Sequence, residues 1–429
     1  MKLGLLHLYA TGHINPSLAL AAGLIDRGIE VIDFNILDNA GAIENAGVQF
    51  VPFGQKAMNV GYLAEVARTI ASLSGEQSLH YFGQRMALLE LTAFGELPKL
   101  INSLGIDALI IDQLFPGGST LAEHLDLPFI SLANALLINE EDGVPPPTLP
   151  WPYDSSAAAS ERNKLGWAGT RKIFQPLLEI TNKQRYAWGL APHSDFLQDG
   201  ISSLLQLAQL PASFDFPRSS APANLHYVGP LRHKRARRDP PFSWDWLNGK
   251  PLIYASLGTL QNGLPWIYST IVEAAKHLDA QIVLSLGGTK GNFTFEDLPT
   301  NVLVVDYAPQ EAVLDRASLC ITHAGLNTVV DCLTRGVPMV AIPIASEQPG
   351  NAARIVWTGT GKMVPLDQLT PECLRTAVQD TMGETAYRAN ARRFAAEIAG
   401  SNPVAIASEL VIDALRSTVE AAQSTTAEA

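Results

Sequence analysis

The chain has 429 residues, a length that favours two or three domains at about 150 residues each. Hydrophobic residues make up 47% of it and charged residues 17%, which supports packed cores and excludes a largely disordered chain. The formal net charge of −12 argues against nucleic acid as a partner, because binding to a polyanion depends mainly on phosphate neutralisation. It also argues against docking on anionic lipid through a basic face.

Cysteine content and apolar runs bear on the compartment. The three cysteines, Cys320, Cys332 and Cys373, are too few for a disulfide framework and form no CxxC pair that could hold zinc. The apolar stretch at the N-terminus is too short for a signal-peptide core, and no run approaches the ~18 apolar residues of a membrane-spanning helix. We therefore expect a soluble cytoplasmic protein.

The first half of the chain alternates short apolar runs with amphipathic stretches. Such strands separated by helices are typical of βαβ units on a parallel sheet. The proline-rich stretch Gly143–Pro152 (GVPPPTLPWP) then excludes regular structure. The expected strands are Lys2–Leu8, Ile29–Phe34, Val48–Pro52, Ala108–Asp112 and Phe129–Leu132, and the first expected helix is Ser17–Arg27.

The basic stretch Leu231–Pro241 (LRHKRARRDPP) interrupts this pattern at mid-chain, and its simplest interpretation is a solvated linker between domains. The alternation then restarts. Strands are expected over Leu252–Ser256, Gln281–Ser285, Val302–Val305, Leu319–Thr322 and Met339–Ile344, and helices over Trp266–His277, from Leu326, and over Pro371–Met382, Glu384–Ala399 and Pro403–Ala422.

The predicted organisation is therefore an N-terminal domain over 1–230, a linker over 231–245 and a C-terminal domain over 246–400. Residues 401–429 are expected to form a helix that packs back on the N-terminal domain and frays from Ser424. Two such α/β halves imply a cleft between them, and open parallel sheets bind ligands at the carboxyl ends of their strands.

The first candidate for chemistry is His13, in the turn between the first strand and the first helix. Gly12 permits a tight turn and Pro16 suits the first turn of a helix. The partial positive charge at a helix start favours a neutral imidazole, which is the form a general base requires. The alternative is a histidine that only satisfies backbone groups at the helix start.

Asp112 ends the strand ALIID and is expected to reach the same cleft. Its carboxylate could accept the second N–H of the His13 imidazole, orient the ring and stabilise the imidazolium that forms on proton abstraction. The alternative is an aspartate that caps the following turn.

The C-terminal half offers candidates for binding an anion. Ser256, Gly258 and Thr259 follow its first strand, where small hydroxyl residues and glycine can meet a phosphate. Thr322–Thr328 (THAGLNT) leads from a strand into a helix, whose free N–H groups favour an anion. The donors gathered in this segment are His323, Asn327 and Thr328, after Gly325. Asp331, one turn further on, is spaced to reach ribose hydroxyls, and the alternative is a capped helix beside a core histidine.

The loop Pro343–Gln348 (PIASEQ) places Glu347 beside Gln348, a pair suited to hydrogen bonding with several sugar hydroxyls. The sequence contains no GxGxxG, GxxxxGK, HExxH or GxSxG motif, so the common dinucleotide, P-loop, zincin and serine-hydrolase fingerprints are absent. It also contains no Asp-x-Asp, so no metal is expected to assist a nucleotide-sugar reaction.

With these residues assembled, the sequence resembles the UDP-glycosyltransferase family that glycosylates small lipophilic acceptors. Tyr307–Gln348 (YAPQEAVLDRASLCITHAGLNTVVDCLTRGVPMVAIPIASEQ) is similar to the donor-site signature of the plant enzymes, and GHINP to the N-terminal catalytic motif. The segments GGSTLAEHLDLPFISLANAL, FDFPR, HYVGPLR, ASLGTLQ and EQPGNAAR look closest to the bacterial carotenoid-glycosylating branch, the zeaxanthin glucosyltransferases.

The resemblance implies the GT-B fold, with two Rossmann-like parallel-sheet domains facing each other across a cleft. It implies His13 as the base and Asp112 as its partner, and no cofactor or metal. Tyr307 would stack on the uracil, the backbone of Ala308 would pair with the base, and Gln310 and Asp331 would meet the ribose. The implied diphosphate site comprises Gly12, Ser256, Gly258, Thr259, His323, Gly325, Leu326, Asn327 and Thr328, and Glu347 and Gln348 would hold the sugar.

Three positions depart from the plant signature. Tyr307 replaces a Trp, Leu326 stands where plants have Trp, and Glu347 stands where Asp is usual. The segment between Gln310 and His323 is also two residues shorter. The changes at Leu326 and Glu347 bear on the identity of the sugar, and Tyr307 should stack over less area than a Trp.

The predicted reaction is an inverting transfer of a sugar, glucose above others, from a UDP-sugar to a hydroxyl of a carotenoid, flavonoid or phenol, with possible contact at a membrane surface. The alternatives are a UDP-sugar epimerase, a dehydrogenase and a non-catalytic UDP-sugar-binding subunit. An acceptor pocket is expected in the N-terminal half, although apolar residues are more often core. Its candidate residues are Phe82, Met86, Phe115, Trp151 and Phe174.

Overall fold

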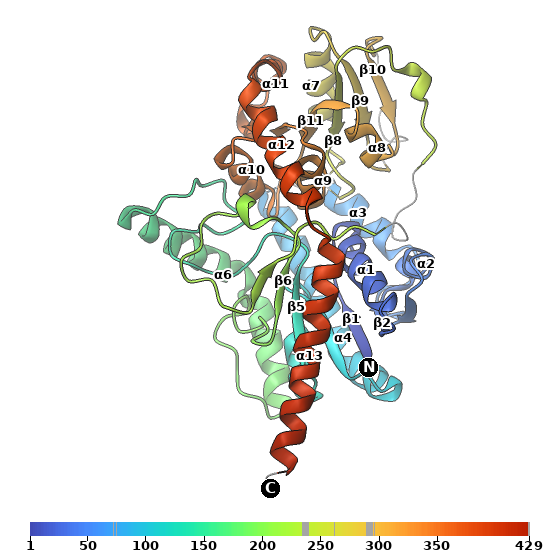
Figure 1. The fold of residues 1–429 in the computed structure, drawn as a ribbon, viewed down its shortest axis with the longest axis vertical. Helices are drawn as coiled ribbons and strands as arrows, with labels where there is room; N and C mark the ends of the chain where they lie inside the picture. Colours follow the sequence, from blue (N-terminus) through green and yellow to red (C-terminus); the bar gives the residue numbers. More distant parts are fainter. Residues whose placement is uncertain are drawn as a thin grey trace.

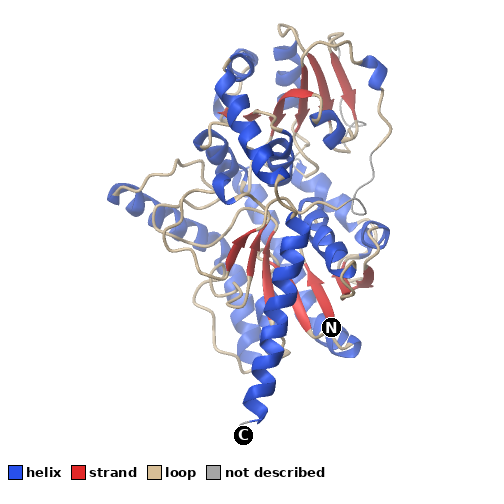
Figure 2. Cartoon of the chain, viewed as in Figure 1, coloured by secondary structure: helices blue, strands red, loops and turns tan. Residues whose placement is uncertain are grey.

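The protein consists of two α/β domains stacked one above the other, with their sheets drawn in red in Figure 2. The computed structural model describes residues 1–71, 73, 75–233, 240–260, 262–288, 295 and 297–427. Each domain has one sheet of parallel strands with helices on its faces, which confirms the predicted fold class.

The N-terminal sheet has seven strands in the order β3-β2-β1-β4-β5-β6-β7, and its pairings are parallel. Its strand order reverses direction between β1 and β4, which are neighbours at the centre of the sheet. The bounds are β1 Lys2–Leu6, β2 Glu30–Asn35, β3 Gln49–Pro52, β4 Ala108–Asp112, β5 Phe129–Ala133, β6 Gln206–Ala208 and β7 Leu225–Tyr227.

Helices cover both faces of this sheet and bury two hydrophobic clusters against it. One cluster contains α1 residues such as Leu18, and the other contains α4 residues such as Leu97. The helices are α1 Thr11–Ile25, α2 Ala40–Asn45, α3 Tyr62–Ala71, α4 Gly75–Leu104, α5 Gly118–His124 and α6 Ala157–Ala187.

The C-terminal sheet repeats the same plan with six parallel strands in the order β10-β9-β8-β11-β12-β13. Its reversal lies between β8 and β11. The strands are β8 Leu252–Ser256, β9 Gln281–Ser285, β10 Val302–Val305, β11 Ala317–Thr322, β12 Met339–Ala341 and β13 Gly361–Met363. The helices are α7 Pro265–Ala275, α8 Gln310–Leu314, α9 Leu326–Arg335, α10 Gln348–Trp357, α11 Pro371–Gly383 and α12 Thr385–Ala399.

The last helix, α13 (Pro403–Ala427), leaves the C-terminal domain and runs along the N-terminal one (Figure 1). It packs on α1, and Val404 and Val411 belong to the hydrophobic cluster that contains Leu18. A Cβ on Gly23 of α1 would lie 2.3 Å from a methyl carbon of Val404, so the two helices approach closely because this position is glycine.

Two long helices and one helix start differ from the sequence expectations. The first helix begins at Thr11, not Ser17, so Pro16 lies in its second turn. The helices α4 and α6 were not predicted, and each contains a proline, Pro98 and Pro176 respectively, that hides its periodicity. Packing against each other and against the sheet stabilises them despite these breaks.

The shorter elements α2, α3, α5, α8, α10 and β13 were not predicted either. The strands β6 and β7 have three residues each, too few for a period-2 pattern, and β12 ends at Ala341 because Pro343 follows. Gly143–Pro152 forms neither helix nor strand beyond one bridge of Val144, as expected. Of the predicted linker, 234–239 lies outside the described residues. The backbone of α13 is helical to Ala427, past the predicted fraying point at Ser424, and 428–429 lie outside the described residues.

Within the described ranges, no single helix is both long and apolar enough to cross a membrane. One pair bent by 49°, Thr385–Ala399 with Pro403–Ser417, meets the length and composition criteria together.

Candidate active site

The candidate residues gather at the reversal points of the two sheets. His13 follows β1 and Asp112 ends β4, and these strands pair side by side through Leu6 and Ile111. In the other domain, Ser256 ends β8 in register with Thr322 at the end of β11, immediately before His323. Where the strand order reverses, the two connections leave on opposite faces and open a crevice at the carboxyl ends of the strands. Each domain therefore carries its candidate residues at the carboxyl ends of its central strands.

His13 and Asp112 form a hydrogen-bonded pair. The Nδ1 of His13 donates to the Oδ2 of Asp112 over 2.6 Å, which leaves Nε2 as the nitrogen with a lone pair. The Asp112 side chain is 1% exposed, and its Oδ1 accepts the backbone N–H of Leu114 over 3.0 Å. Asn134, at the end of β5, donates from Nδ2 to the same Oδ2 over 3.0 Å. Sequence reasoning missed Asn134, although it lies two residues after the predicted strand Phe129–Leu132.

The charges of this pair favour its ionised form. Burial alone would lower the pKa of His13, but the charge and hydrogen bond of Asp112, with a smaller contribution from Glu347, raise that pKa above its usual 6.5. Burial would raise the pKa of Asp112, and His13 outweighs this and lowers it. The expectation that the helix start keeps His13 neutral is therefore wrong in direction, because a buried carboxylate at 2.6 Å exerts a stronger field than the partial charge of a helix end.

An Asp112→Asn variant tests this coupling. The asparagine keeps an acceptor for Nδ1–H but removes the negative charge, so burial dominates and the pKa of His13 falls. If His13 is the base predicted from the sequence, it acts as the neutral ring, so the acidic limb of the kcat/KM–pH profile is expected above pH 6.5 in the wild type and at lower pH in the variant. A rate profile of the predicted transfer between pH 5 and 9 checks this, and a limb that does not move would contradict the coupling.

A proline in α1 explains how the two domains meet beside His13. Residue 16 of a regular helix would donate its N–H to the carbonyl of Gly12, but Pro16 has none. The Gly12 carbonyl instead accepts a hydrogen bond from Nδ2 of Asn327 in α9, at 2.7 Å. A Cβ on Gly12 would lie 3.3 Å from that nitrogen, so glycine also permits the approach. The catalytic candidate thus lies one residue from a contact with the anion-binding candidate.

His323 is enclosed between two glycines. A Cβ on Gly258, whose φ is +78°, would lie 2.7 Å from the imidazole, and one on Gly325 would lie 2.4 Å from its Nε2. Burial lowers the pKa of His323 to about 4, so the ring is neutral at pH 7. Its Nδ1 is buried and has no hydrogen-bond partner among the residues that the structure describes. A buried polar atom without a partner is uncommon and is consistent with a ligand at this position.

The start of α9 is open to an anion. No side chain caps its first turn, and no acidic residue lies there. Thr328 and Ser256 are buried nearby and Thr259 is exposed, so hydroxyls surround this helix end. Ala324, just before it, has a positive φ of 64°, which is uncommon for a residue other than glycine. Leu326 differs from expectation, because its side chain is 2% exposed in the hydrophobic core and only its backbone faces the helix start.

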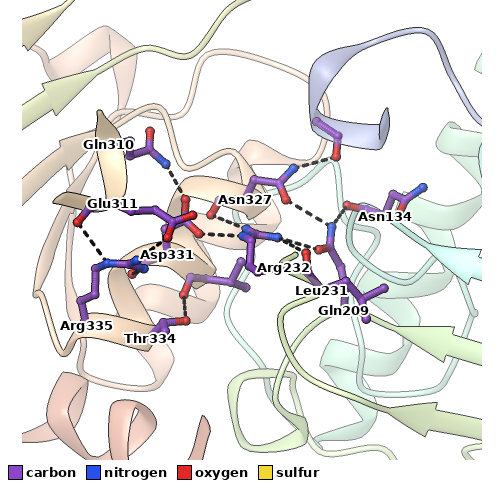
Figure 3. A network of polar contacts seen from close by, with 12 residues as sticks. Asn134, Gln209, Leu231, Arg232, Gln310, Glu311, Asn327, Asp331, Thr334 and Arg335 are labelled. Atoms are coloured by element: carbon purple, nitrogen blue, oxygen red, sulfur yellow. Dashed lines mark hydrogen bonds and ion pairs between the residues drawn. The ribbon is translucent and has the colours of Figure 1, made fainter. Parts of the chain in front are cut away.

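The nucleoside candidates lie in the loop between β10 and α8, at the start of α8 and in the middle of α9. Tyr307 is 52% exposed, which leaves its ring available for stacking, and Ala308 is next to it in the same loop. A Cβ on Gly288 would clash with the Tyr307 hydroxyl, so this loop packs on a glycine. Gln310 donates from Nε2 to Oδ2 of Asp331 over 2.6 Å (Figure 3). The structure therefore brings together the two residues expected at the ribose.

The sugar candidates start α10. Glu347 is half-buried, and burial raises its pKa. Its charge contributes to the raised pKa of His13, which indicates that the two side chains lie near each other. The side-chain oxygen of Gln348 accepts the backbone N–H groups of Ile344 and Ala345 at 2.8 and 3.0 Å. Gln348 thus shapes the loop with its oxygen, a use that its position in the sequence did not indicate.

Four of the five acceptor candidates lie together, mainly as core. Met86 and Phe115 are buried in the cluster under α4, and Phe82 and Phe174 pack on its edge. Trp151 lies apart, beneath the guanidinium of Arg162 at 5.0 Å. Phe115 also lines a small pocket on the β4–α5 loop, together with Asp112, Ser119, Thr181, His193 and Phe196.

Over the described ranges, no group of three or more His, Cys, Asp or Glu side chains is arranged to hold a metal ion.

Comparison with known proteins places this geometry in context. Residues 190–405 match the family model described as UDP-glucoronosyl and UDP-glucosyl transferase. The zeaxanthin glucosyltransferase of Pantoea ananas is 36% identical over 356 residues, covering 82% of this chain and 81% of that relative. The crystal structure of the glycotransferase of kitacinnamycin matches with a TM-score of 0.74 at 22% identity, covering 96% of this chain and 98% of that one. SsfS6 from Streptomyces sp. SF2575, complexed with thymidine diphosphate, matches with a TM-score of 0.63 at 19% identity, covering 96% and 99%. The neighbours are GT-B glycosyltransferases, and the two-sheet architecture agrees with theirs.

Proposed function

Since the chain belongs to the UDP-glucoronosyl and UDP-glucosyl transferase family and is a glycosyltransferase acting on small-molecule acceptors, we propose that it transfers glucose from UDP-glucose to a hydroxyl of a lipophilic acceptor with inversion. The observation that carries this proposal is the His13–Asp112 pair at 2.6 Å, one residue from the Gly12–Asn327 contact. A base and an anion-binding helix start thereby share one crevice.

The proposed reaction begins at Nε2 of His13. This nitrogen takes the proton of the acceptor hydroxyl, while the Nδ1–H group keeps its hydrogen bond to Asp112. The carboxylate of Asp112 stabilises the imidazolium that forms. The acceptor oxygen forms a bond to the anomeric carbon from the face opposite UDP. The bond from that carbon to the β-phosphate oxygen breaks, and its electron pair leaves with UDP. One displacement at this carbon inverts its configuration.

The leaving diphosphate gains negative charge, which we assign to the start of α9, His323 and the neighbouring hydroxyls. A helix N-terminus stabilises such charge through its free N–H groups and its dipole. Gly258 and Gly325 keep the backbone close to this position. In this proposal Glu347 and Gln348 contact the sugar, Tyr307 stacks on the uracil, and no cofactor takes part.

Removal of divalent metal provides one check. Because protein groups are assigned to stabilise the charge on the diphosphate, we expect millimolar EDTA to leave the transfer rate unchanged within about twofold. A catalytic metal supplies several kcal/mol, so its removal would lower the rate far more than this. The measurement is UDP release from EDTA-treated, desalted protein with and without added Mg²⁺ or Mn²⁺. A loss above tenfold that Mg²⁺ restores would show that a metal takes part.

The acceptor class is a finer proposal. The Pantoea ananas relative is named for zeaxanthin, and segments spread along the chain resemble that branch, so a carotenoid such as zeaxanthin is the first choice. Flavonoids and other phenols are the second, because flat aromatic alcohols suit the same chemistry. We place the protein in the cytoplasm, with contact at a membrane surface where it collects a carotenoid.

The test incubates purified protein with UDP-glucose and a panel of zeaxanthin in detergent, a flavonol, a simple phenol and a sterol. Mass spectrometry reads the addition of hexose, and NMR of the product reads its anomeric configuration. Hexose on zeaxanthin with a β-linkage supports the full proposal. Hexose mainly on the flavonol or phenol supports the mechanism and replaces the acceptor. Retention of configuration would overturn the displacement at His13, and transfer from another UDP-sugar alone would replace the donor.

A further inference from the structure

Arg232 follows β7, at the end of the N-terminal domain, yet its guanidinium lies against α9 of the other domain (Figure 3). Its Nε donates to Oδ1 of Asp331 over 2.8 Å, and its NH2 donates to the carbonyl oxygen of Asn327 over 3.1 Å. Its NH1 donates to Oε1 of Gln209 over 3.3 Å and to the carbonyl of Leu231 over 2.9 Å. Four acceptors from both domains therefore fix this guanidinium.

The carboxylate of Asp331 is held from two sides. Arg232 occupies Oδ1, and the amide of Gln310 donates to Oδ2 over 2.6 Å, with the side chain of Asp331 only 1% exposed. A carboxylate this deeply buried keeps its charge in place only with a paired cation and hydrogen bonds. Arg232 supplies that cation, and its side chain is 24% exposed.

The contact continues into the N-terminal domain. Gln209, which accepts from Arg232, donates from Nε2 to the carbonyl of Asn134 over 2.6 Å. Asn134 in turn donates to Asp112. Arg232 is thus anchored to residues that surround the catalytic pair, and it approaches Asp331 as part of the opposite domain.

Building on the proposed UDP-sugar donor, we infer that Arg232 is a positioning residue that sets selectivity for the ribose. It pairs with the Asp331 carboxylate and holds it in one orientation, while the amide of Gln310 gives way to ribose hydroxyls. A ribonucleoside diphosphate then gains hydrogen bonds to a charged acceptor that its 2′-deoxy analogue cannot form. The donor specificity of the C-terminal domain therefore depends on a residue supplied by the N-terminal side of the cleft.

Calorimetric titration of UDP and 2′-deoxy-UDP, without acceptor, measures this directly. The wild type is expected to prefer UDP by roughly 10- to 100-fold, the value of hydrogen bonds to a charged group. In Arg232→Met the preference is expected to fall to within about threefold, mostly through weaker UDP binding. Arg232→Lys keeps a cation without the planar fork and should restore an intermediate preference.

Two further variants complete the design. Arg27→Met is the matched control, because Arg27 is 29% exposed and pairs with Glu409 on α13, away from the cleft, and it should keep the wild-type preference. In Asp331→Asn the preference should also be lost, and adding Arg232→Met to it should lower the preference no further, since Arg232 acts through Asp331.

The outcomes separate this inference from the proposed function. A wild type that neither binds UDP nor transfers sugar would remove the proposed donor itself. A wild type that transfers sugar but binds both nucleotides equally would overturn the role of Asp331. Full preference in both Arg232 variants, or equal weakening of UDP and 2′-deoxy-UDP, would overturn the role of Arg232 as a positioning residue. Thermal melting identifies any variant that does not fold. If Arg232→Met does not fold, the preference for UDP over 2′-deoxy-UDP is compared between the wild type and Arg232→Lys.

Discussion

Replacing His13 with alanine is expected to reduce turnover on an alkyl alcohol such as zeaxanthin by about 10²- to 10⁴-fold, the usual contribution of a general base. The loss should be smaller on a nitrophenol, since this acceptor is already partly ionised at neutral pH. The side chain of His13 is 16% exposed and hydrogen-bonds to Asp112, which Leu114 and Asn134 also hold, so we expect the alanine variant to fold. Turnover is measured as UDP release on both acceptors.

The matched control is His277→Ala, which removes an exposed histidine just after α7, and it should leave the turnover unchanged. Equal losses of His13→Ala on both acceptors would show that His13 positions the substrate and does not remove a proton. An unchanged KM for UDP-glucose would show that the donor site is intact.

Replacing Asp215 with asparagine is expected to have the largest effect on stability. Its Oδ1 accepts from Arg354 at 2.8 Å and its Oδ2 from Arg218 at 2.8 Å and from the hydroxyl of Tyr227 at 2.7 Å. Both arginines are buried, so a neutral asparagine leaves Arg354 without this counter-charge and leaves Arg218 only the more distant Glu141, at 3.9 Å, at a cost of about 3–5 kcal/mol. Because Arg354 belongs to α10, the two domains are joined here as well. We expect a drop of roughly 10 °C in the melting temperature.

The dependence of this effect on pH follows from the pKa of Asp215. Burial alone would raise that pKa, but Arg354 and Arg218 lower it far below its usual value. A carboxylate with a lowered folded-state pKa stabilises the native state above its unfolded pKa of about 3.9, and this stabilisation is lost as the pH falls below that value. The wild type and Asp215→Asn should therefore differ in melting temperature at pH 7, and the difference should begin to shrink as the pH falls below about 4 and keep shrinking at still lower pH. The control is Asp279→Asn, whose side chain is 88% exposed in a surface pair with Lys250, and it should change little.

Arg354 and Asp215 also show what the sequence could and could not predict. Both lie in segments that resemble the carotenoid branch, EQPGNAAR and FDFPR, but their pairing joins positions 139 residues apart. The strands at the sheet centres were predicted to within one or two residues, since a buried strand is a continuous apolar run. The helices α4 and α6 were missed because packing, and not local pattern, makes them helical.

The same division applies to the site. The pairing of His13 with Asp112 could be predicted because His13 follows one predicted strand and Asp112 ends another, and parallel strands bring their ends together. The sequence could not predict the roles of Asn134, Gln209 and Arg232. These roles depend on contacts between different elements of the fold, and the contact of Arg232 with Asp331 crosses from one domain to the other. The direction of the His13 pKa shift depended on a distance of 2.6 Å, which no spacing in the sequence supplies.

The packing of α13 on α1 determines the order in which the molecule can be completed during synthesis. The cluster around Leu18 and Leu24 includes Val404, Val411 and Leu415, so the N-terminal domain lacks part of its core until the last helix has been made. At about 5–20 residues per second, the nearly 400 residues between them take roughly 20 to 80 seconds. During that time the apolar side of α1, the helix that carries His13, is not covered by α13. The first domain to leave the ribosome is therefore the last to reach its final stability, and a chain that stops before Pro403 leaves it exposed to aggregation.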